Sequence, residues 1–100
     1  MRWHVELNEG GTALRVEHLE DPQLALQRAR ELAAEAVGGH PRASADEVER
    51  AVGRMADEGL DDVMPGDDRD YAINDQVHVF VAGLDENDSD EDCWMCRRAA

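Results

Sequence analysis

The stretch RWHVELNEGGTALRVE, residues 2–17, decides the fold, because apolar and polar residues alternate on either side of a Gly-Gly pair. Every second residue from Trp3 to Leu7 is apolar, so the apolar side chains share one face of a strand and the polar ones share the other. The alternation resumes after Gly10-Gly11. Two such runs across a glycine turn predict a β-hairpin with one buried face.

Two helices are expected after the hairpin. Asp21-Pro22 combines an N-cap with a proline in the first helical position, and apolar residues at three- and four-residue spacing continue up to Gly38-Gly39, which is expected to end the helix. Ser44 and Glu47 form a capping box that opens a second helix, and Gly59 is expected to end it.

The rest of the chain predicts one strong strand and a tail. Residues 60–70 indicate an acidic loop and residues 71–73 a short strand. Residues 77–82 are apolar on both faces except for His78, which is typical of a central strand. We therefore expect a small α+β domain over residues 1–84, with an antiparallel sheet and two helices on one face, in the order β-β-α-α-(β)-β. Residues 85–100 indicate a flexible acidic tail.

Charge is the strongest functional signal. The 100 residues include 24 Asp and Glu, 10 Arg and no Lys, for a formal net charge of −14. The acid is concentrated from Asp57 to Asp92, where Arg69 is the one basic residue. Such a surface repels nucleic acid and anionic membranes and attracts basic protein surfaces.

The sequence therefore predicts a non-enzymatic protein-binding protein whose partner is the basic surface of a nucleic-acid-binding protein. Rows of carboxylates can mimic phosphates and mask such a surface, which would make the protein an inhibitor. By analogy of size and charge, this is typical of phage-encoded counter-defence proteins, anti-CRISPR proteins among them. Trp94 joins the candidates because tryptophan is enriched at binding hot spots. The candidate partner-binding residues are Glu31, Glu35, Asp57, Glu58, Asp61, Asp62, Asp67, Asp68, Asp70 and Trp94.

Two alternatives remain open. Dense surface carboxylates without lysine also occur in halophilic proteins, where the acid serves solvation and implies no partner. Cys93-x-x-Cys96 is half of a zinc site, which would make this a small metal-binding protein. The histidines show no paired ligand spacing, and His4 and His18 are expected to form an ordinary exposed pair across the hairpin. Zinc at Cys93 and Cys96 is therefore a weak candidate, and no cofactor is expected.

Other functional classes find little support in the sequence. No serine or threonine lies in a pattern typical of a nucleophile with its base, and no glycine-rich phosphate loop occurs. The acidic run from Asp85 lacks the glycine and glutamate that an EF-hand loop requires. An enzyme is not expected. Two cysteines close together near the C-terminus, with no apolar span, indicate a reducing cytoplasm and no membrane association.

Overall fold

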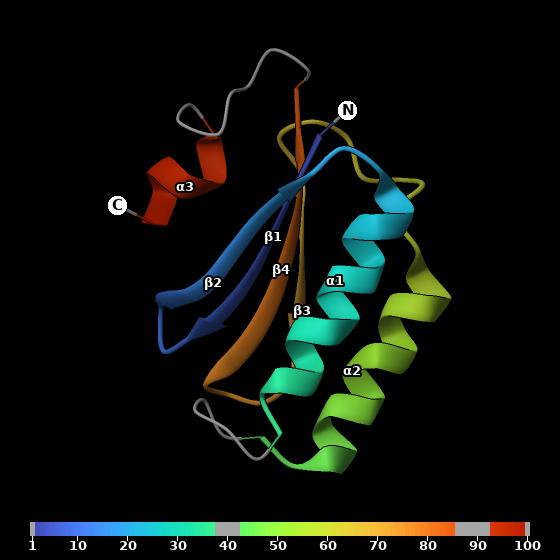
Figure 1. Ribbon diagram of the computed structural model, residues 1–100, viewed down its shortest axis with the longest axis vertical. Helices are drawn as coiled ribbons and strands as arrows, with labels where there is room; N and C mark the ends of the chain where they lie inside the picture. Colours follow the sequence, from blue (N-terminus) through green and yellow to red (C-terminus); the bar gives the residue numbers. More distant parts are fainter. Residues whose placement is uncertain (1, 38–42, 86–92, 100) are drawn as a thin grey trace.

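Figure 1 shows the computed structural model, a four-stranded antiparallel sheet with two long helices on one face and a short helix on the other. The structure describes residues 2–37, 43–85 and 93–99. Its elements are β1 (Arg2–Glu9), β2 (Thr12–Leu19), α1 (Pro22–Glu35), α2 (Ala45–Glu58), β3 (Asp68–Ala72), β4 (Val77–Leu84) and α3 (Trp94–Ala99). The predicted α+β class and its order of elements are confirmed. No helix in the described ranges is long and apolar enough to span a membrane.

The hairpin forms at the predicted turn. Gly10 and Gly11 have φ angles of 58° and 90°, and Glu9 pairs with Thr12 across them. A two-residue turn with positive φ at both positions matches the right-handed twist of the strands it joins, and glycine adopts it without strain.

The sheet has the strand order β2-β1-β4-β3, so β1 and β4 are its two central strands. The prediction that residues 77–82 form a central strand is confirmed. The polar face expected for residues 2–8 is buried, however: Glu6 is only 2 % exposed, and His4 and Asn8 are buried as well. The predicted alternation of apolar and polar side chains between the two faces is correct. The hairpin sequence alone, however, does not reveal that β4 pairs with the other side of β1. We call this second face of the sheet the back face, and the face under α1 and α2 the helix face.

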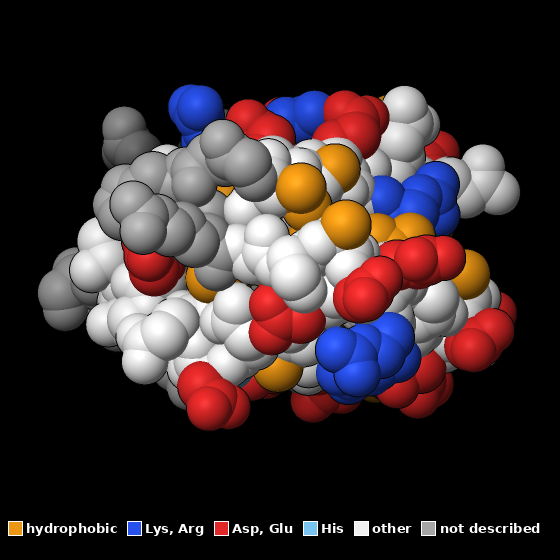
Figure 2. All heavy atoms as spheres, turned by 90° about the horizontal axis from the view of Figure 1, so that it is seen from below, with side chains coloured by type: hydrophobic (Ala, Val, Ile, Leu, Met, Phe, Trp, Pro, Cys, Tyr) orange, Lys and Arg blue, Asp and Glu red, His pale blue; other side chains and the backbone are white. Residues whose placement is uncertain are grey.

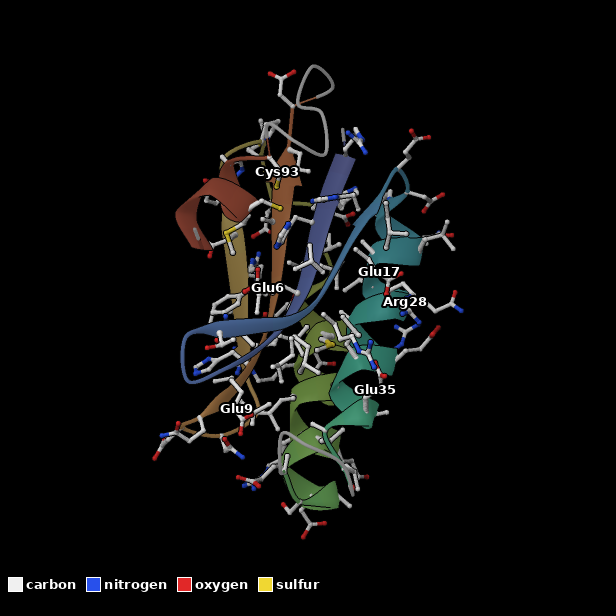
Figure 3. All side chains as sticks on the ribbon, turned by 60° about the vertical axis from the view of Figure 1, so that its left-hand side comes forward. Glu6, Glu9, Glu17, Arg28, Glu35 and Cys93 are labelled. Carbon is white, nitrogen blue, oxygen red and sulfur yellow. The ribbon has the colours of Figure 1, made fainter. Side chains whose placement is uncertain are left out.

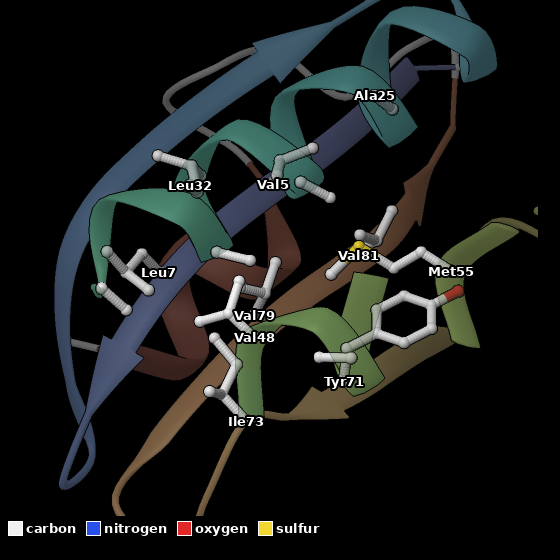
Figure 4. Close-up of a cluster of buried hydrophobic side chains, with 14 of the residues drawn as sticks. Val5, Leu7, Ala25, Leu32, Val48, Met55, Tyr71, Ile73, Val79 and Val81 are labelled. Atoms are coloured by element: carbon white, nitrogen blue, oxygen red, sulfur yellow. The ribbon is translucent and has the colours of Figure 1, made fainter. Parts of the chain in front are cut away.

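The main core lies between the helix face and the two long helices, as Figure 4 shows. Val5, Val81 and Tyr71 from the strands meet Leu32 of α1 and Met55 of α2. The buried positions of α1 are otherwise mainly alanines, which let this helix lie close to the sheet. Apolar burial of this kind stabilises a domain by roughly 25 cal/mol per Å² removed from water.

Capping residues act as predicted at three of the four ends of the long helices. The Asp21 carboxylate accepts the backbone N–H of Gln23, and Ser44 and Glu47 form a reciprocal capping box. The backbone N–H of Ser44 donates to the Glu47 carboxylate and lowers its pKa, and the Ser44 side chain adds to this effect. Gly59, with φ of 62°, ends α2 as expected. Helix α1 already ends at Glu35, and the expected stop at residues 38–39 lies outside the described residues.

The acidic loop is shorter than the sequence indicates. Residues 68–70, expected in the loop, belong to β3, whereas Ile73, expected in the strand, follows it. The sequence does not predict a strand here because Asp68, Arg69 and Asp70 are all charged, which is not typical of a strand. An edge strand tolerates such residues, because only one of its sides is paired and its charged side chains reach water.

We expect Leu32→Ala to lower the free energy of unfolding by about 2–5 kcal/mol, because it leaves a cavity at a fully buried position of α1. Leu24→Ala on the same helix is the matched control, since Leu24 is half exposed, and should change stability by less than about 0.5 kcal/mol. Urea denaturation followed by circular dichroism measures both. Equal losses in the two variants would contradict this packing of α1.

Candidate metal centre

Four side chains of the types that bind metals, two histidines and two cysteines, converge on the back face of the sheet, beneath α3. They are His4, His18, Cys93 and Cys96, and their ligand atoms all lie within 4.8 Å of one another. His4 and Cys93 are completely buried, whereas His18 and Cys96 are partly buried. Figure 3 shows Cys93 where the chain enters α3, on the opposite side of the sheet from α1. The cluster joins the first hairpin to the C-terminal helix.

Secondary structure positions these ligands in pairs. His4 of β1 and His18 of β2 are direct partners in the antiparallel register, so both imidazoles lie on the back face. Cys93 precedes α3 and Cys96 lies in its first turn. Residues three apart on a helical turn point to the same side, which directs both thiols at the imidazole pair.

Helix α3 contacts the sheet over β4. Cys93 and Met95 are buried against Ala82 and Leu84 in a small apolar cluster separate from the main core. The Trp94 indole N–H donates a hydrogen bond of 3.0 Å to the backbone carbonyl of Gly83. Ala82 is also the β4 residue that pairs with His4. Its small side chain leaves room on the back face for the Cys93 thiol beside the imidazole.

Four distances between ligand atoms lie close to those of tetrahedral coordination. The Nδ1 atom of His4 lies 3.1 Å from Nε2 of His18 and 3.4 Å from Sγ of Cys93. Sγ of Cys96 lies 3.6 Å from each of the same two nitrogens. Tetrahedral zinc, with Zn–S bonds of about 2.3 Å and Zn–N bonds of about 2.0–2.1 Å, separates its ligand atoms by about 3.3–3.8 Å. The three nitrogen–sulfur distances fall in this range, the nitrogen–nitrogen distance of 3.1 Å is slightly shorter, and all four atoms lie within 4.8 Å of one another, so the cluster is close in size to a Cys₂His₂ zinc site.

A buried hydrogen-bond chain orients His4. Its Nε2–H donates to the Glu6 carboxylate at 2.8 Å, and the second oxygen of Glu6 accepts the Asn8 side-chain N–H at 2.8 Å. Asn8 in turn accepts the backbone N–H of Gly11 in the hairpin turn. An ionised Glu6 only accepts hydrogen bonds, so it favours the His4 tautomer with its proton on Nε2, in which the lone pair of Nδ1 faces the other three ligands. A carboxylate behind a histidine ligand is a recurrent feature of zinc sites.

The same geometry also places a thiol, an imidazole and a carboxylate in line, as in a cysteine nucleophile with its base. Two observations favour metal binding over that chemistry. The Cys93 thiol is completely buried, whereas an attacking thiolate must be partly exposed to its substrate. His18 and Cys96 also face the same point as His4 and Cys93, which is expected of a metal-ligand set. Four protein ligands leave no open position, so the arrangement suits a structural metal site.

The sequence predicts Cys93 and Cys96 as weak zinc ligands, but it does not predict their histidine partners. His4 and His18 do lie across the hairpin from each other, as predicted, but the expectation that the pair is exposed is wrong. Ligand spacing along the chain gave no signal, because the pair arises from the hairpin register. Counting back from the Gly10-Gly11 turn alone would have placed His4 opposite Glu17. The register shift between Leu7 and Asn8 moves the pairing by one residue and brings His4 opposite His18.

Most of the predicted acidic contact residues lie around the C-terminal end of α2 and along β3, and all of these are exposed. Several form ion pairs: Arg69 pairs with both Glu58 and Asp62, and Asp70 accepts a 2.7 Å hydrogen bond from His78. The other members of this group are Asp57, Asp61, Asp67 and Asp68.

The remaining predicted contact residues lie elsewhere. Glu31 and Glu35 belong to α1, where they pair with Arg28 and Arg15. Trp94 is half-buried in α3, where its indole N–H is already used by Gly83. The ten predicted residues thus do not form a single surface.

Comparison with known proteins gave no relative from which a role could be carried over: no protein family, curated protein or solved structure matches this chain.

We expect Glu6→Gln to lower the affinity for zinc about 10- to 100-fold, because the neutral amide is a weaker acceptor and no longer raises the basicity of His4. The matched control is Glu20→Gln, an exposed glutamate just after β2, which should leave the affinity unchanged. Competition with a chromophoric zinc chelator measures both constants. Equal affinities in the two variants would show that Glu6 does not support a metal ligand.

Proposed function

We propose that this protein binds one zinc ion through His4, His18, Cys93 and Cys96, and that the ion fastens α3 to the back face of the sheet. The observation that carries the proposal is the convergence of four ligand atoms within 4.8 Å of one another, with distances of 3.1–3.6 Å from His4 Nδ1 to the other ligands and from Cys96 Sγ to His18, close to those of tetrahedral coordination. Two thiolates neutralise the charge of a divalent cation, so the occupied site places no net charge in a buried position.

The ligand set also favours zinc over other divalent ions. Magnesium and calcium prefer oxygen ligands, whereas two thiolates and two imidazoles in a tetrahedron suit zinc. Because thiolates and neutral imidazoles are needed, binding releases protons, and the affinity is expected to fall as the pH drops below neutrality.

Protein purified or refolded with zinc should contain one ion per chain by elemental analysis. His18→Ala and Cys96→Ser each remove a ligand and should abolish stoichiometric binding, while the matched control His78→Ala, a β4 histidine outside the cluster, should retain the ion. Removal of zinc by a chelator should speed amide hydrogen exchange in α3 and leave the exchange of β1 nearly unchanged. Wild-type protein that holds no metal after refolding in excess zinc would contradict the proposal.

A second candidate function is binding to a basic protein surface, as an inhibitor that mimics nucleic acid. The observation that favours it is the uneven placement of charge. Around the C-terminal end of α2, exposed acids dominate and Arg69 is held by Glu58 and Asp62. At the opposite end of the molecule, which Figure 2 views, acidic and basic side chains are interspersed. A field of one sign concentrated at one end is suited to steering a basic partner.

For this second function we expect Asp57→Lys combined with Asp61→Lys to slow association with a basic partner at least tenfold at low salt, because it reverses two exposed charges near the end of α2. Glu20→Lys combined with Glu49→Lys makes the same change in net charge elsewhere and is the control. Biosensor kinetics against a panel of DNA-binding proteins measure the rates. A uniform lack of binding by the wild-type protein, or equal effects of both double variants, would refute acidic recognition at this end.

A further inference from the structure

Strand β2 is an edge of the sheet, with β1 as its only strand neighbour among the residues that the structure describes. It is eight residues long and contains no proline or lysine. Its apolar residues Leu14 and Val16 are 38 % and 41 % exposed. An edge strand presents unpaired backbone N–H and C=O groups along its outer side, and proteins usually block such an edge with charge, proline or a short strand. Strand β2 is long and has no proline, and its two charged residues, Arg15 and Glu17, are of opposite sign. The one irregularity in its pairing with β1 is the register shift at Leu14, beside the hairpin turn.

The opposite edge of the sheet is different. Strand β3 has five residues, and Asp68 and Asp70 give it a negative charge that Arg69 only partly offsets. Two β3 edges would therefore repel each other. The charges of β2 are one Arg15 and one Glu17, which balance. In a chain with a net charge of −14, β2 is the edge that a second copy can approach without a clash of like charges.

The order of these two charges makes the edge complementary to itself. Arg15 and Glu17 flank Val16, and both point to the helix face, where they pair with Glu35 and Arg28 of α1. An antiparallel pairing centred on Val16 places Arg15 of one copy opposite Glu17 of the other, twice, by symmetry. Figure 3 shows Glu17 beside Arg28 on the side of β2 that faces α1. Arg15 is 64 % exposed and lies 3.7 Å from Glu35, so this surface pair restrains it little.

We propose that two copies of this protein pair through β2, antiparallel and centred on Val16, to form a symmetric dimer with a continuous eight-stranded sheet. Such a contact satisfies the outer backbone groups of both strands and brings the two Val16 side chains together. Opposite charges facing each other across neighbouring strands fix the register. The contact uses the edge of β2 and its helix-face charges, so it does not depend on metal binding at the back face.

The test uses two charge variants, separately and mixed. Arg15→Glu leaves two acids on the edge and Glu17→Arg leaves two bases, so each variant should repel its own copies and sediment as an 11.1 kDa monomer, whereas the wild type reaches twice that mass with increasing concentration. An equimolar mixture of the two variants should form a heterodimer, because every acid then faces a base. Analytical ultracentrifugation measures the masses, and native mass spectrometry with one variant isotopically labelled identifies the mixed species.

Arg30→Glu is the matched control: it makes the same charge change as Arg15→Glu at an exposed position of α1, and it should remain dimeric. Circular dichroism and zinc content, measured for every variant, establish that the fold is intact. A wild type that stays monomeric at millimolar concentration overturns the proposal. A dimer that persists in both single variants also overturns it, as does a mixture that does not associate.

Discussion

The pairing of β1 with β4 is the constraint on which the rest of the structure depends. It joins the first strand of the chain to the last and makes both of them central in the sheet. As a result, the side chains on both faces of β1 are buried, in two separate regions of the protein. The apolar residues of β1 face α1 and α2, whereas its polar residues are buried on the back face, where each needs a partner. The hydrogen-bond chain from Asn8 through Glu6 to His4 supplies those partners, and it orients His4 toward the other candidate metal ligands.

The candidate ligand set has its largest energetic consequence for α3, the helix that the metal would hold against the sheet. A six-residue helix is too short to be stable in isolation, and among the described side chains of residues 93–96 only Cys93, just before α3, and Met95 are buried. Structural zinc sites bind with apparent free energies of about 10–16 kcal/mol, which is as large as the total stability of a typical domain, about 5–15 kcal/mol. Coordination at the proposed site would therefore outweigh the apolar contacts of α3 in holding it to the sheet.

The parts of the fold that could be predicted from the sequence are those that local chemistry determines. Gly10-Gly11 requires positive φ, Asp21 and Ser44 cap helices through their own side chains, and the valines of β4 suit a buried strand. The boundaries of β3 could not be predicted, because its acidic residues are tolerated only at an edge and edges are a property of the whole sheet. The burial of His4 could not be predicted for the same reason. The candidate metal centre brings together residues up to 92 positions apart, and no local pattern encodes that proximity.

The same strand order bears on how a chain with a net charge of −14 could associate with itself. Strand β3 and the acids around it lie at one edge of the sheet, and β2 lies at the other. In a dimer joined at β2, the two β3 strands would be separated by seven strand spacings, or about 34 Å at about 4.8 Å each. The Debye length at physiological salt is about 8 Å, so repulsion between the two acidic edges would be largely screened. A surface that attracts a basic partner at one edge is thus compatible with self-association at the other.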